Sequence, residues 1–481
     1  MNKPVCISLL IAVFAAFAAD ARISLPAVIS DNMVLQQQTD VRLWGEAAPG
    51  ENVRIMASWA DAPVAVKAGA DGHWECTVST PEASFDRHRI VFKGKNTVTV
   101  DNVLIGEVWM CTGQSNMAFP VGPHPERSKW QTGMIDMEAQ LKDADYPGIR
   151  FFKVEYCESP GEPKDDCGGS WIECSPESAF DFSAVGFVFG RRLFNELDVP
   201  VGLISASRGD THAESWIKED VMKDNPFYDD VYAEFGIDKV EQSRKPYKVP
   251  ATLWNGMINP VLRYRVRGNI WYQGEANDMR ADRYQQVFTD LIDSWREELR
   301  NPDMPFYFVQ IAPYYKQSPA IREAQLDTWQ SGIRNIGMAV ITDGGDSLDI
   351  HPRDKALPGE RLARWALARD YGKDVAYSGP LYRSMKPVGS AVELSFDYAG
   401  SGLAAQGGGE LVGFMVAGPD RRFVRADARI EGDKVVVSSP EVRHPVAVRY
   451  GFDCFFRANL CNNDGLPASP FRTDRWPVKK Q

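Results

Sequence analysis

The sequence predicts a mixed α/β protein, in which a parallel sheet covered by helices on both faces is flanked by two all-β regions. Between about residues 102 and 375, strand-like apolar runs alternate with segments of helical apolar spacing. Repeated strand–helix units of this kind build parallel sheets that are buried on both faces. On either side, short alternating runs are separated by glycine-containing turns, which is typical of antiparallel β structure.

The composition favours a folded protein over a disordered one. The chain has 481 residues, of which 44% are hydrophobic and 25% are charged. This length is enough for two to four domains. The formal net charge is −11, so a nucleic-acid partner is not expected.

Residues 1–21 have the pattern of a secretory signal peptide. Lys3 supplies the positive start, residues 5–19 are apolar, and residues 16–18 or 19–21 offer a small-residue cleavage site. The apolar run is short for a membrane span. We therefore expect an exported chain, periplasmic or extracellular, that starts near Arg22 and has no membrane span after cleavage.

The cysteines leave several pairings open. Cleavage after residue 21 leaves seven of them, so at least one thiol is unpaired. Cys167 and Cys174, and likewise Cys454 and Cys461, are close in sequence and could form disulfides in an oxidising compartment. Cys111 lies in an apolar run and is predicted to be a small buried side chain. No C-x-x-C motif occurs, and no metal or other cofactor is predicted.

Residues 22–101 are predicted to form a small N-terminal β domain, most simply a sandwich. Turn signals at Pro49-Gly50 and Asp71-Gly72 separate its strand-like runs. These runs are residues 33–35, 41–44, 53–55, 64–66 and 97–100.

Residues 102–375 are predicted to form the central α/β domain. The expected strands are residues 108–111, 201–205, 266–272, 306–311 and 337–342, and the expected helices are residues 182–197, 251–261, 284–299, 321–331 and 360–371. Two segments, at about residues 121–176 and 219–250, break the alternation. They are predicted to be insertions that shape a substrate pocket.

Residues 376–481 return to a β pattern and form the predicted C-terminal β region. Residues 391–396 and 435–437 alternate or run apolar, and glycine-containing turns lie at residues 407–409 and 431–433. The expected domain order is therefore β, α/β, β.

The stretch around Ser115 places a serine where a strand of the predicted sheet ends. Residues 108–111 favour a strand, and Gly113 permits a sharp bend before the serine. Ligands of open α/β sheets bind at this carboxyl edge, so Ser115 is a candidate nucleophile. The alternative is that Ser115 only caps the next helix, because Met117 stands where the elbow G-x-S-x-G requires glycine.

A serine nucleophile needs a base, and histidine is the usual one. Of the six histidines, His212 and His351 follow predicted strands of the sheet and should open on the same edge as Ser115. Asp349 lies two residues before His351 and could orient the imidazole if the loop turns back. Asp349 and Asp346 could equally serve only in loop solvation and helix capping.

Two further loops offer donors for the oxyanion that ester hydrolysis generates. Gly209 could present a backbone N–H and Asn277 a side-chain amide. Arg208, His212 and Arg280 lie near these loops, and one of them could bind a substrate carboxylate. The simpler explanation of these three is a surface charge or a structural pair.

Four segments together resemble the SGNH hydrolases, and more closely the carbohydrate acetylesterases that include sialate O-acetylesterases. The likeness extends to residues 33–36, 377–382 and 459–474, so it covers nearly the whole chain after residue 21. The four segments are Gly-Gln-Ser-Asn-Met at 113–117, residues 202–216, Trp-Tyr-Gln-Gly-Glu-Ala-Asn at 271–277 and Asp-Ile-His-Pro-Arg-Asp-Lys at 349–355.

The resemblance implies a flavodoxin-like, three-layer α/β/α SGNH domain at residues 102–375. It implies that Ser115 is the nucleophile and His351 the base, with Asp349 as the acid that orients the base. The oxyanion hole then comprises the Ser115 N–H, Gly209 and Asn277. Substrate binding is assigned to Gln114, Arg208, His212 and Glu275.

The sequence departs from the family pattern in three respects, at four positions. Many SGNH enzymes carry the acid three residues before the histidine, where this chain has Leu348, so Asp349, Asp346 or a backbone carbonyl could orient His351. Arg208 and Asp210 stand where relatives often have tryptophan and glycine, which leaves the pocket chemistry open. Ala276 replaces a common serine.

The predicted function is removal of O-acetyl groups from sialic acids, with an O-acetylated carbohydrate as substrate. An alternative with the same chemistry is an acetylxylan or other plant-glycan acetylesterase. Two other classes are a non-catalytic glycan-binding protein and a glycoside hydrolase that uses two carboxylates, for example Glu214 and Glu275.

Overall fold

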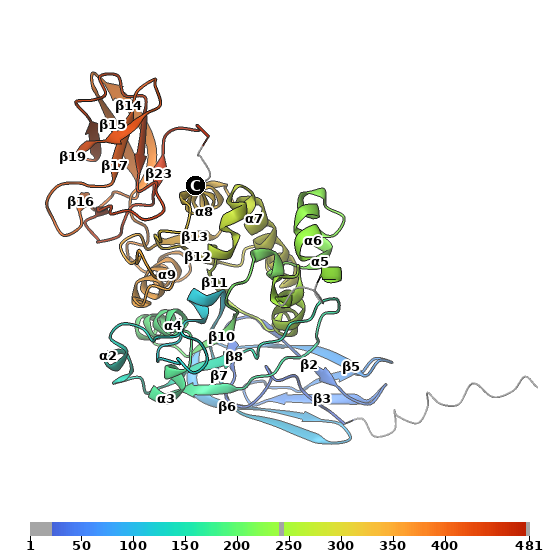
Figure 1. Ribbon diagram of the computed structural model, residues 1–481. Helices are drawn as coiled ribbons and strands as arrows, with labels where there is room; N and C mark the ends of the chain where they lie inside the picture. The colour runs from blue at the N-terminus through green and yellow to red at the C-terminus, as the bar shows by residue number, and fades with distance from the viewer. Residues whose placement is uncertain (1–21, 240–244, 478–481) are drawn as a thin grey trace, which may run out of the picture.

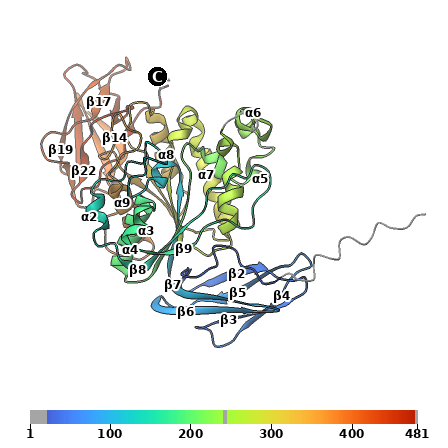
Figure 2. The same cartoon turned by 60° about the horizontal axis from the view of Figure 1, so that its bottom comes forward.

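The computed structural model describes residues 22–239 and 245–477. The predicted signal peptide, residues 1–21, lies outside the described residues. A central α/β part stands between two β regions, which lie on different sides of it (Figures 1 and 2). The protein is therefore a mixed α/β structure with a central mixed sheet and flanking β-sheets.

The central sheet has the strand order β13-β12-β11-β7-β10-β8-β9. Neighbouring strands are parallel from β13 to β8, and only the edge strand β9 runs antiparallel. The strands are β7 (Thr97–Gly113), β8 (Tyr146–Lys153), β9 (Trp171–Cys174), β10 (Val201–Ser207), β11 (Gly268–Tyr272), β12 (Phe306–Gln310) and β13 (Ile336–Val340). The helices of this part are α1 (Ser115–Ala118), α2 (Met137–Leu141), α3 (Pro176–Phe180), α4 (Ala184–Leu197), α5 (Glu219–Met222), α6 (Asp229–Phe235), α7 (Ala281–Glu298), α8 (Pro319–Gln330) and α9 (Ala356–Arg369).

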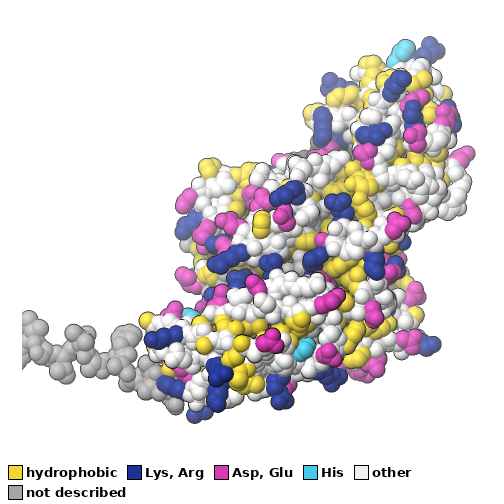
Figure 3. Space-filling model, turned by 180° about the vertical axis from the view of Figure 1, so that it is seen from behind, with side chains coloured by type: hydrophobic (Ala, Val, Ile, Leu, Met, Phe, Trp, Pro, Cys, Tyr) yellow, Lys and Arg dark blue, Asp and Glu magenta, His cyan; other side chains and the backbone are white. Residues whose placement is uncertain are grey.

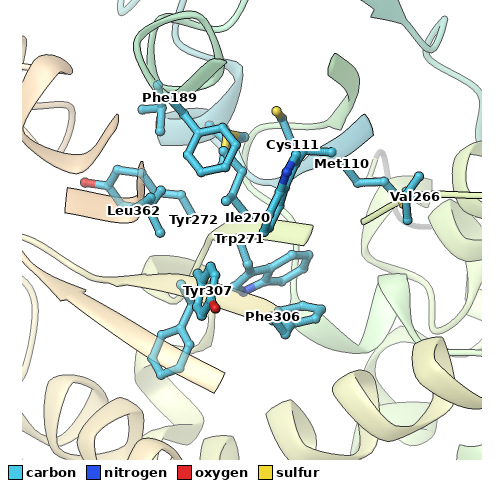
Figure 4. Packing of buried hydrophobic residues seen from close by; sticks show 14 of the residues in the cluster. Met110, Cys111, Phe189, Val266, Ile270, Trp271, Tyr272, Phe306, Tyr307 and Leu362 are labelled. Atoms are coloured by element: carbon cyan, nitrogen blue, oxygen red, sulfur yellow. The ribbon is translucent and has the colours of Figure 1, made fainter. Parts of the chain in front are cut away.

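Helices pack on both sides of strand β12. Phe306 and Phe308 contact Phe288 of α7, whereas Tyr307 between them contacts Trp365 of α9. Because successive side chains of a strand point to opposite faces, α7 and α9 cover opposite faces of the sheet. Figure 4 shows this core around β11 and β12 at close range. Burial on both faces explains the continuous apolar runs of these strands.

Strand β7 belongs to two sheets. Its first half pairs with β1 and β6 of the N-terminal β region, and its second half pairs with β10 and β11. The predicted domain boundary at residue 101 falls within this strand. The two sheets are thus joined by one continuous backbone and not by a linker.

The N-terminal β region pairs β4-β3-β6-β7-β1 in one sheet and β2 with β5 in a second. Trp74 of β5 contacts Phe92 of β6, so the two sheets pack face to face. The strands are β1 (Val34–Gln36), β2 (Asp40–Glu46), β3 (Asn52–Ala57), β4 (Val64–Lys67), β5 (His73–Ser79) and β6 (Ser84–Lys93).

The C-terminal β region consists of antiparallel sheets with the orders β14-β15-β20-β19 and β18-β17-β21-β23, and of the pair β16-β22. Phe471 of β23 stacks on Tyr382 of β14, with ring centroids 4.6 Å apart, which joins the two larger sheets. The strands are β14 (Leu381–Val388), β15 (Ala391–Asp397), β16 (Leu403–Ala405), β17 (Phe414–Ala417), β18 (Phe423–Arg425), β19 (Asp427–Glu431), β20 (Lys434–Ser438), β21 (Ala447–Tyr450), β22 (Leu460–Asn462) and β23 (Phe471–Arg472).

The structure differs from the sequence-based expectation in two local features. The segment at residues 121–176, expected as an insertion, contributes β8 and β9 to the central sheet. The helix expected at residues 251–261 is a π-helical turn at Trp254–Ile258 followed by a 3₁₀ turn at Asn259–Val261. Pro260 lacks the N–H that a continued α-helix needs.

The two suggested disulfides are not formed. The thiol of Cys174 donates to the carbonyl of Ala144 at 3.4 Å, and the thiol of Cys461 donates to the carbonyl of Ala404 at 3.5 Å. Cys111 is fully buried, and this burial raises the pKa of its thiol. These thiols therefore behave as small core side chains.

The surface carries both signs of charge. On the face drawn in Figure 3, lysine and arginine side chains are interspersed with aspartate and glutamate. None of the helices within residues 22–239 and 245–477 combines the length and the apolarity that a membrane crossing requires.

Gly113 provides a test of how the end of β7 is built. Its φ is +137°, and a Cβ there would lie 2.2 Å from the carbonyl oxygen of Tyr272. We expect Gly113→Ala to lower the free energy of unfolding by well over 2 kcal/mol, since strain at a positive φ and a backbone clash add. The matched control is Gly432→Ala, at φ +64° in open space, which should lose only about 1 kcal/mol. Equal losses in denaturant unfolding would contradict the clash.

Candidate active site

Ser115 lies at the carboxyl edge of the central sheet, at the first residue of helix α1. The bend at Gly113 turns the chain out of β7, and the N–H of Gln114 donates to the carbonyl of Tyr272 at 3.0 Å. This bond fixes the turn against the end of β11. Ser115 is 6% exposed, so the residue is largely shielded from solvent at this edge.

His351 meets Ser115 although 236 residues separate them in sequence. The imidazole Nε2 lies 2.9 Å from the Ser115 Oγ. His351 stands in the loop between β13 and α9, and its ring stacks on Trp130 with centroids 4.8 Å apart. Burial, together with the nearby Lys355 cation, lowers the pKa of His351 to about 4. A neutral imidazole can accept the proton of the serine hydroxyl.

Asp349 is the carboxylate beside His351. One oxygen of Asp349 accepts the backbone N–H of His351 at 2.8 Å and lies 3.5 Å from the imidazole Nδ1. The loop therefore turns back as an orienting role requires. Asp346 instead accepts the N–H of Leu348 at 2.8 Å, which is an ordinary turn contact.

Gly209 lies directly against Ser115. A Cβ built on Gly209 would lie 3.4 Å from the Ser115 Cβ, so the end of β10 comes close to the serine. The adjacent Arg208 donates from Nη1 to the Gly209 carbonyl at 3.1 Å. Its guanidinium is held between the rings of Tyr156 and Tyr247, 4.8 and 4.4 Å from their centroids.

Asn277 has a side-chain amide with a fixed orientation. Its Oδ1 accepts from the Ala213 N–H at 2.9 Å and from Gln273 Nε2 at 2.7 Å. Its Nδ2 donates to Glu214 at 2.8 Å. An amide nitrogen carries two hydrogens, so Nδ2 can donate one further hydrogen bond. Glu214 is 1% exposed and serves here as the anchor of Asn277.

Gln114 and His212, two of the predicted substrate-binding residues, form hydrogen bonds with other residues of the protein. Gln114 accepts the N–H of Ala276 at 3.3 Å and so ties the serine turn to the loop after β11. His212 does not join Ser115: its Nδ1 lies 3.2 Å from Arg280 Nη2, and its ring packs on Phe235. Burial and the Arg280 cation lower the pKa of His212 to about 3, so this ring is neutral.

Glu275 belongs to a buried network that the sequence analysis did not identify. The amide nitrogen of Asn116 donates to Glu275 and, at 3.0 Å, to the carbonyl of Ile350, while its oxygen accepts from Lys355. Lys355 is fully buried and lies over the ring of Tyr272. The only signal in the sequence is that Lys355 closes the His351 segment. Its partners are 80 and 239 residues away.

Glu214 and Glu275, the carboxylate pair considered for a glycoside hydrolase, each have a structural partner. Each carboxylate is held by a side-chain amide, Glu214 by Asn277 and Glu275 by Asn116.

In the part of the chain that the structure describes, no group of three or more His, Cys, Asp or Glu side chains is arranged to hold a metal ion.

Residues 105–367 match the model of one protein family, described as carbohydrate esterase, sialic acid-specific acetylesterase. Two curated relatives are sialate O-acetylesterases. The mouse protein is 28% identical over 77% of this chain and 78% of its own length, and the human protein is 29% identical over 73% and 72%. A solved structure, described as a novel carbohydrate acetylesterase from Xanthomonas citri, is 33% identical. It covers 94% of this chain and 100% of its own, with a TM-score of 0.84.

The matched family segment includes Ser115, Gly209, Asn277 and His351, and it spans more than half of the chain. The predicted resemblance to sialate O-acetylesterase-like carbohydrate esterases is thus confirmed, as is the predicted enzyme class, a carboxylic ester hydrolase. The chain belongs to the family of sialic acid-specific acetylesterases among the carbohydrate esterases.

Proposed function

We propose that this carbohydrate esterase removes O-acetyl groups by a serine mechanism. The observation that carries the proposal is the 2.9 Å contact between the Ser115 hydroxyl and the His351 imidazole. Ser115 attacks the acetyl carbonyl while His351 Nε2 takes the hydroxyl proton. The sugar leaves as an alcohol and receives that proton. Water, activated by the same imidazole, then hydrolyses the acetyl-enzyme to acetate.

The oxyanion formed in both steps is stabilised by three N–H groups. They are the backbone N–H groups of Ser115 and Gly209 and the second N–H of Asn277 Nδ2. The fixed orientation of the Asn277 amide, held by Glu214, Ala213 and Gln273, supports this role. Preorganised donors need no rearrangement when the charge develops. Asp349 holds the imidazole in place and stabilises its charged form.

Sialic acid is the proposed sugar, because the curated relatives are sialate O-acetylesterases. Arg208 supports this assignment: its guanidinium stands beside Gly209 and can bind a carboxylate. A neutral plant glycan, such as acetylated xylan, is the alternative. The Xanthomonas citri protein is a carbohydrate acetylesterase, which is compatible with either sugar.

Three further assignments complete the proposal. The central part, residues 102–375, is an SGNH domain with three layers, supported by the packing of α7 and α9 on opposite faces of β12. The N-terminal β domain, residues 22–101, and the C-terminal β region, residues 376–481, flank it. Export to the periplasm or the cell exterior rests on the signal-like pattern of residues 1–21.

The role of Ser115 is tested by Ser115→Ala. Without the hydroxyl no acetyl-enzyme can form, so turnover of a chromogenic acetate should fall by about 10⁴-fold or more. The midpoint of thermal unfolding should stay close to that of the parent, because only one oxygen is removed. Ser318→Ala, which removes a hydroxyl bonded to Asp278 at the start of α8, is the matched control and should keep its activity. Parental turnover in Ser115→Ala would reject the mechanism.

The two candidate acids are separated by the pH profile of kcat/KM. The base must be neutral, so activity falls as the pH drops through the pKa of His351, which is about 4. Asp349 raises that pKa, so Asp349→Asn should move the acid limb to lower pH and also reduce turnover because orientation is lost. Asp346→Asn should leave both unchanged. The opposite pattern would assign the role to Asp346.

The sugar is tested by offering the purified protein 9-O-acetylated sialic acid and acetylated xylan side by side and measuring released acetate. We expect kcat/KM to be at least about tenfold higher for the sialic acid, and Arg208→Met to reduce that preference. A preference for xylan that Arg208→Met leaves unchanged would establish the plant-glycan alternative.

A further inference from the structure

One buried amide connects three of the loops that form the active site. Asn116 stands next to Ser115 in helix α1. Its Nδ2 donates to Glu275, in the loop that carries Asn277, and to the carbonyl of Ile350, the residue before His351. Its Oδ1 accepts from the ammonium of Lys355. The loops of the nucleophile, the base and the oxyanion amide thus meet at a single side chain.

The orientation of this amide is set by the charges around it. If the Asn116 amide turned over, its oxygen would face the Glu275 carboxylate and the Ile350 carbonyl, and its NH₂ group would face the Lys355 ammonium. Every contact would then join two acceptors or two donors. Lys355 on one side, and Glu275 with the Ile350 carbonyl on the other, together hold the NH₂ group toward the two loops.

Burying the charges of Lys355 and Glu275 is unfavourable unless the two groups compensate each other. Lys355 and Asn116 are 0% and 1% exposed, and one oxygen of Glu275 is buried with no hydrogen-bond partner among the described residues. Burial raises the pKa of Glu275 and lowers the pKa of Lys355 to about 7, and each charge partly offsets the shift of the other. Removing one partner leaves the other charge uncompensated.

We propose that Lys355 is a positioning residue of the esterase: by fixing the Asn116 amide, it keeps the His351 loop and the Asn277 loop in register with Ser115. The ammonium of Lys355 bonds to the Asn116 amide, and Lys355 acts through that residue. The proposal rests on the serine mechanism proposed above. It gives a role to Lys355, which closes the His351 segment but has no role assigned from the sequence.

The positive charge of Lys355 also lowers the pKa of His351. The groups around the imidazole are the Ser115 hydroxyl at Nε2, the Asp349 carboxylate near Nδ1, the Trp130 ring against its face, and the Lys355 cation. Lys355 itself is faced by Glu275, Asp349 and Asp354. A cation here disfavours imidazolium, so its removal should make His351 easier to protonate.

The test compares Lys355→Met with the charge-neutral double variant Lys355→Met/Glu275→Gln. We expect Lys355→Met to lower kcat by about 10²-fold with little change in KM, since the reacting groups lose their register while the sugar contacts remain. Its acid limb in kcat/KM should move to higher pH. Lys373→Met, an exposed lysine after α9, is the matched control and should behave as the parent.

The double variant separates positioning from folding. Single Lys355→Met leaves the Glu275 carboxylate unpaired and should unfold at a lower temperature, whereas the double variant should regain the parental midpoint. It should not regain kcat or the parental acid limb, because the donor to Asn116 is still missing. A double variant with parental stability, kcat and pH profile would overturn the proposal.

A second substitution tests the amide itself. Asn116→Asp keeps the shape but replaces the NH₂ donors by oxygen facing Glu275 and Ile350, so a loss of kcat as large as that of Lys355→Met is expected. Parental kcat in Asn116→Asp would also overturn the proposal. Failure of this inference is distinguishable from failure of the serine mechanism: in the former, Ser115→Ala is inactive while both network variants keep parental kcat.

Discussion

The close approach of Ser115 and His351 depends on the parallel arrangement of β7 and β13, with β11 and β12 between them. In a parallel sheet, the loops that follow the strands open at one edge. The serine turn and the histidine loop, 236 residues apart, therefore reach the same place without any special connection. The remaining geometry is set by short contacts between loops, such as the bond from the Gln114 N–H to the Tyr272 carbonyl.

Burial determines the electrostatics at this edge. It keeps His351 and His212 neutral, but only His351 stands beside a serine, while His212 is held by Arg280. The two histidines could not be separated by composition or by spacing. The family resemblance favoured His351, and the coordinates add the neighbours that each ring meets in the folded chain.

The extent to which the sequence predicts this structure follows from how local each signal is. The expected strands at residues 201–205 and 306–311 lie within β10 (Val201–Ser207) or overlap β12 (Phe306–Gln310), because apolar periodicity is a local property. β8 was missed: Pro147 and Gly148 stand near its start, and the turn residues around it resemble a loop. Its assignment to the sheet comes from pairing with β10, which is a long-range contact. The two suggested disulfides were wrong for a related reason, since nearness in sequence does not by itself bring two thiols together.

The candidate site divides in the same way. The placement of Ser115, Gly209, Asn277 and His351 at one edge could be anticipated from the rule for parallel sheets and from the family resemblance, and their catalytic roles stay predictions. The network of Asn116, Glu275 and Lys355 could not be anticipated, because each residue has a plain explanation in its own segment. A buried ammonium is informative only when its partners are known, since burial of an unpaired charge is strongly unfavourable.

The shared strand β7 gives this edge its rigidity. Its N-terminal half is anchored in the β region through β1 and β6, and its C-terminal half carries Gly113 and the serine turn between β10 and β11. A displacement of the serine along the strand would have to break pairing in two sheets at once. The histidine loop has no such strand behind it after β13 ends at Val340. Its position comes from contacts with other loops, such as the backbone bond from the Ile135 N–H to the Arg353 carbonyl, and the bond from Asn116 to the Ile350 carbonyl ties it to the serine helix. The serine helix and the histidine loop are thus held in different ways, the first by strand pairing in two sheets and the second by contacts between loops that include the buried Asn116 amide.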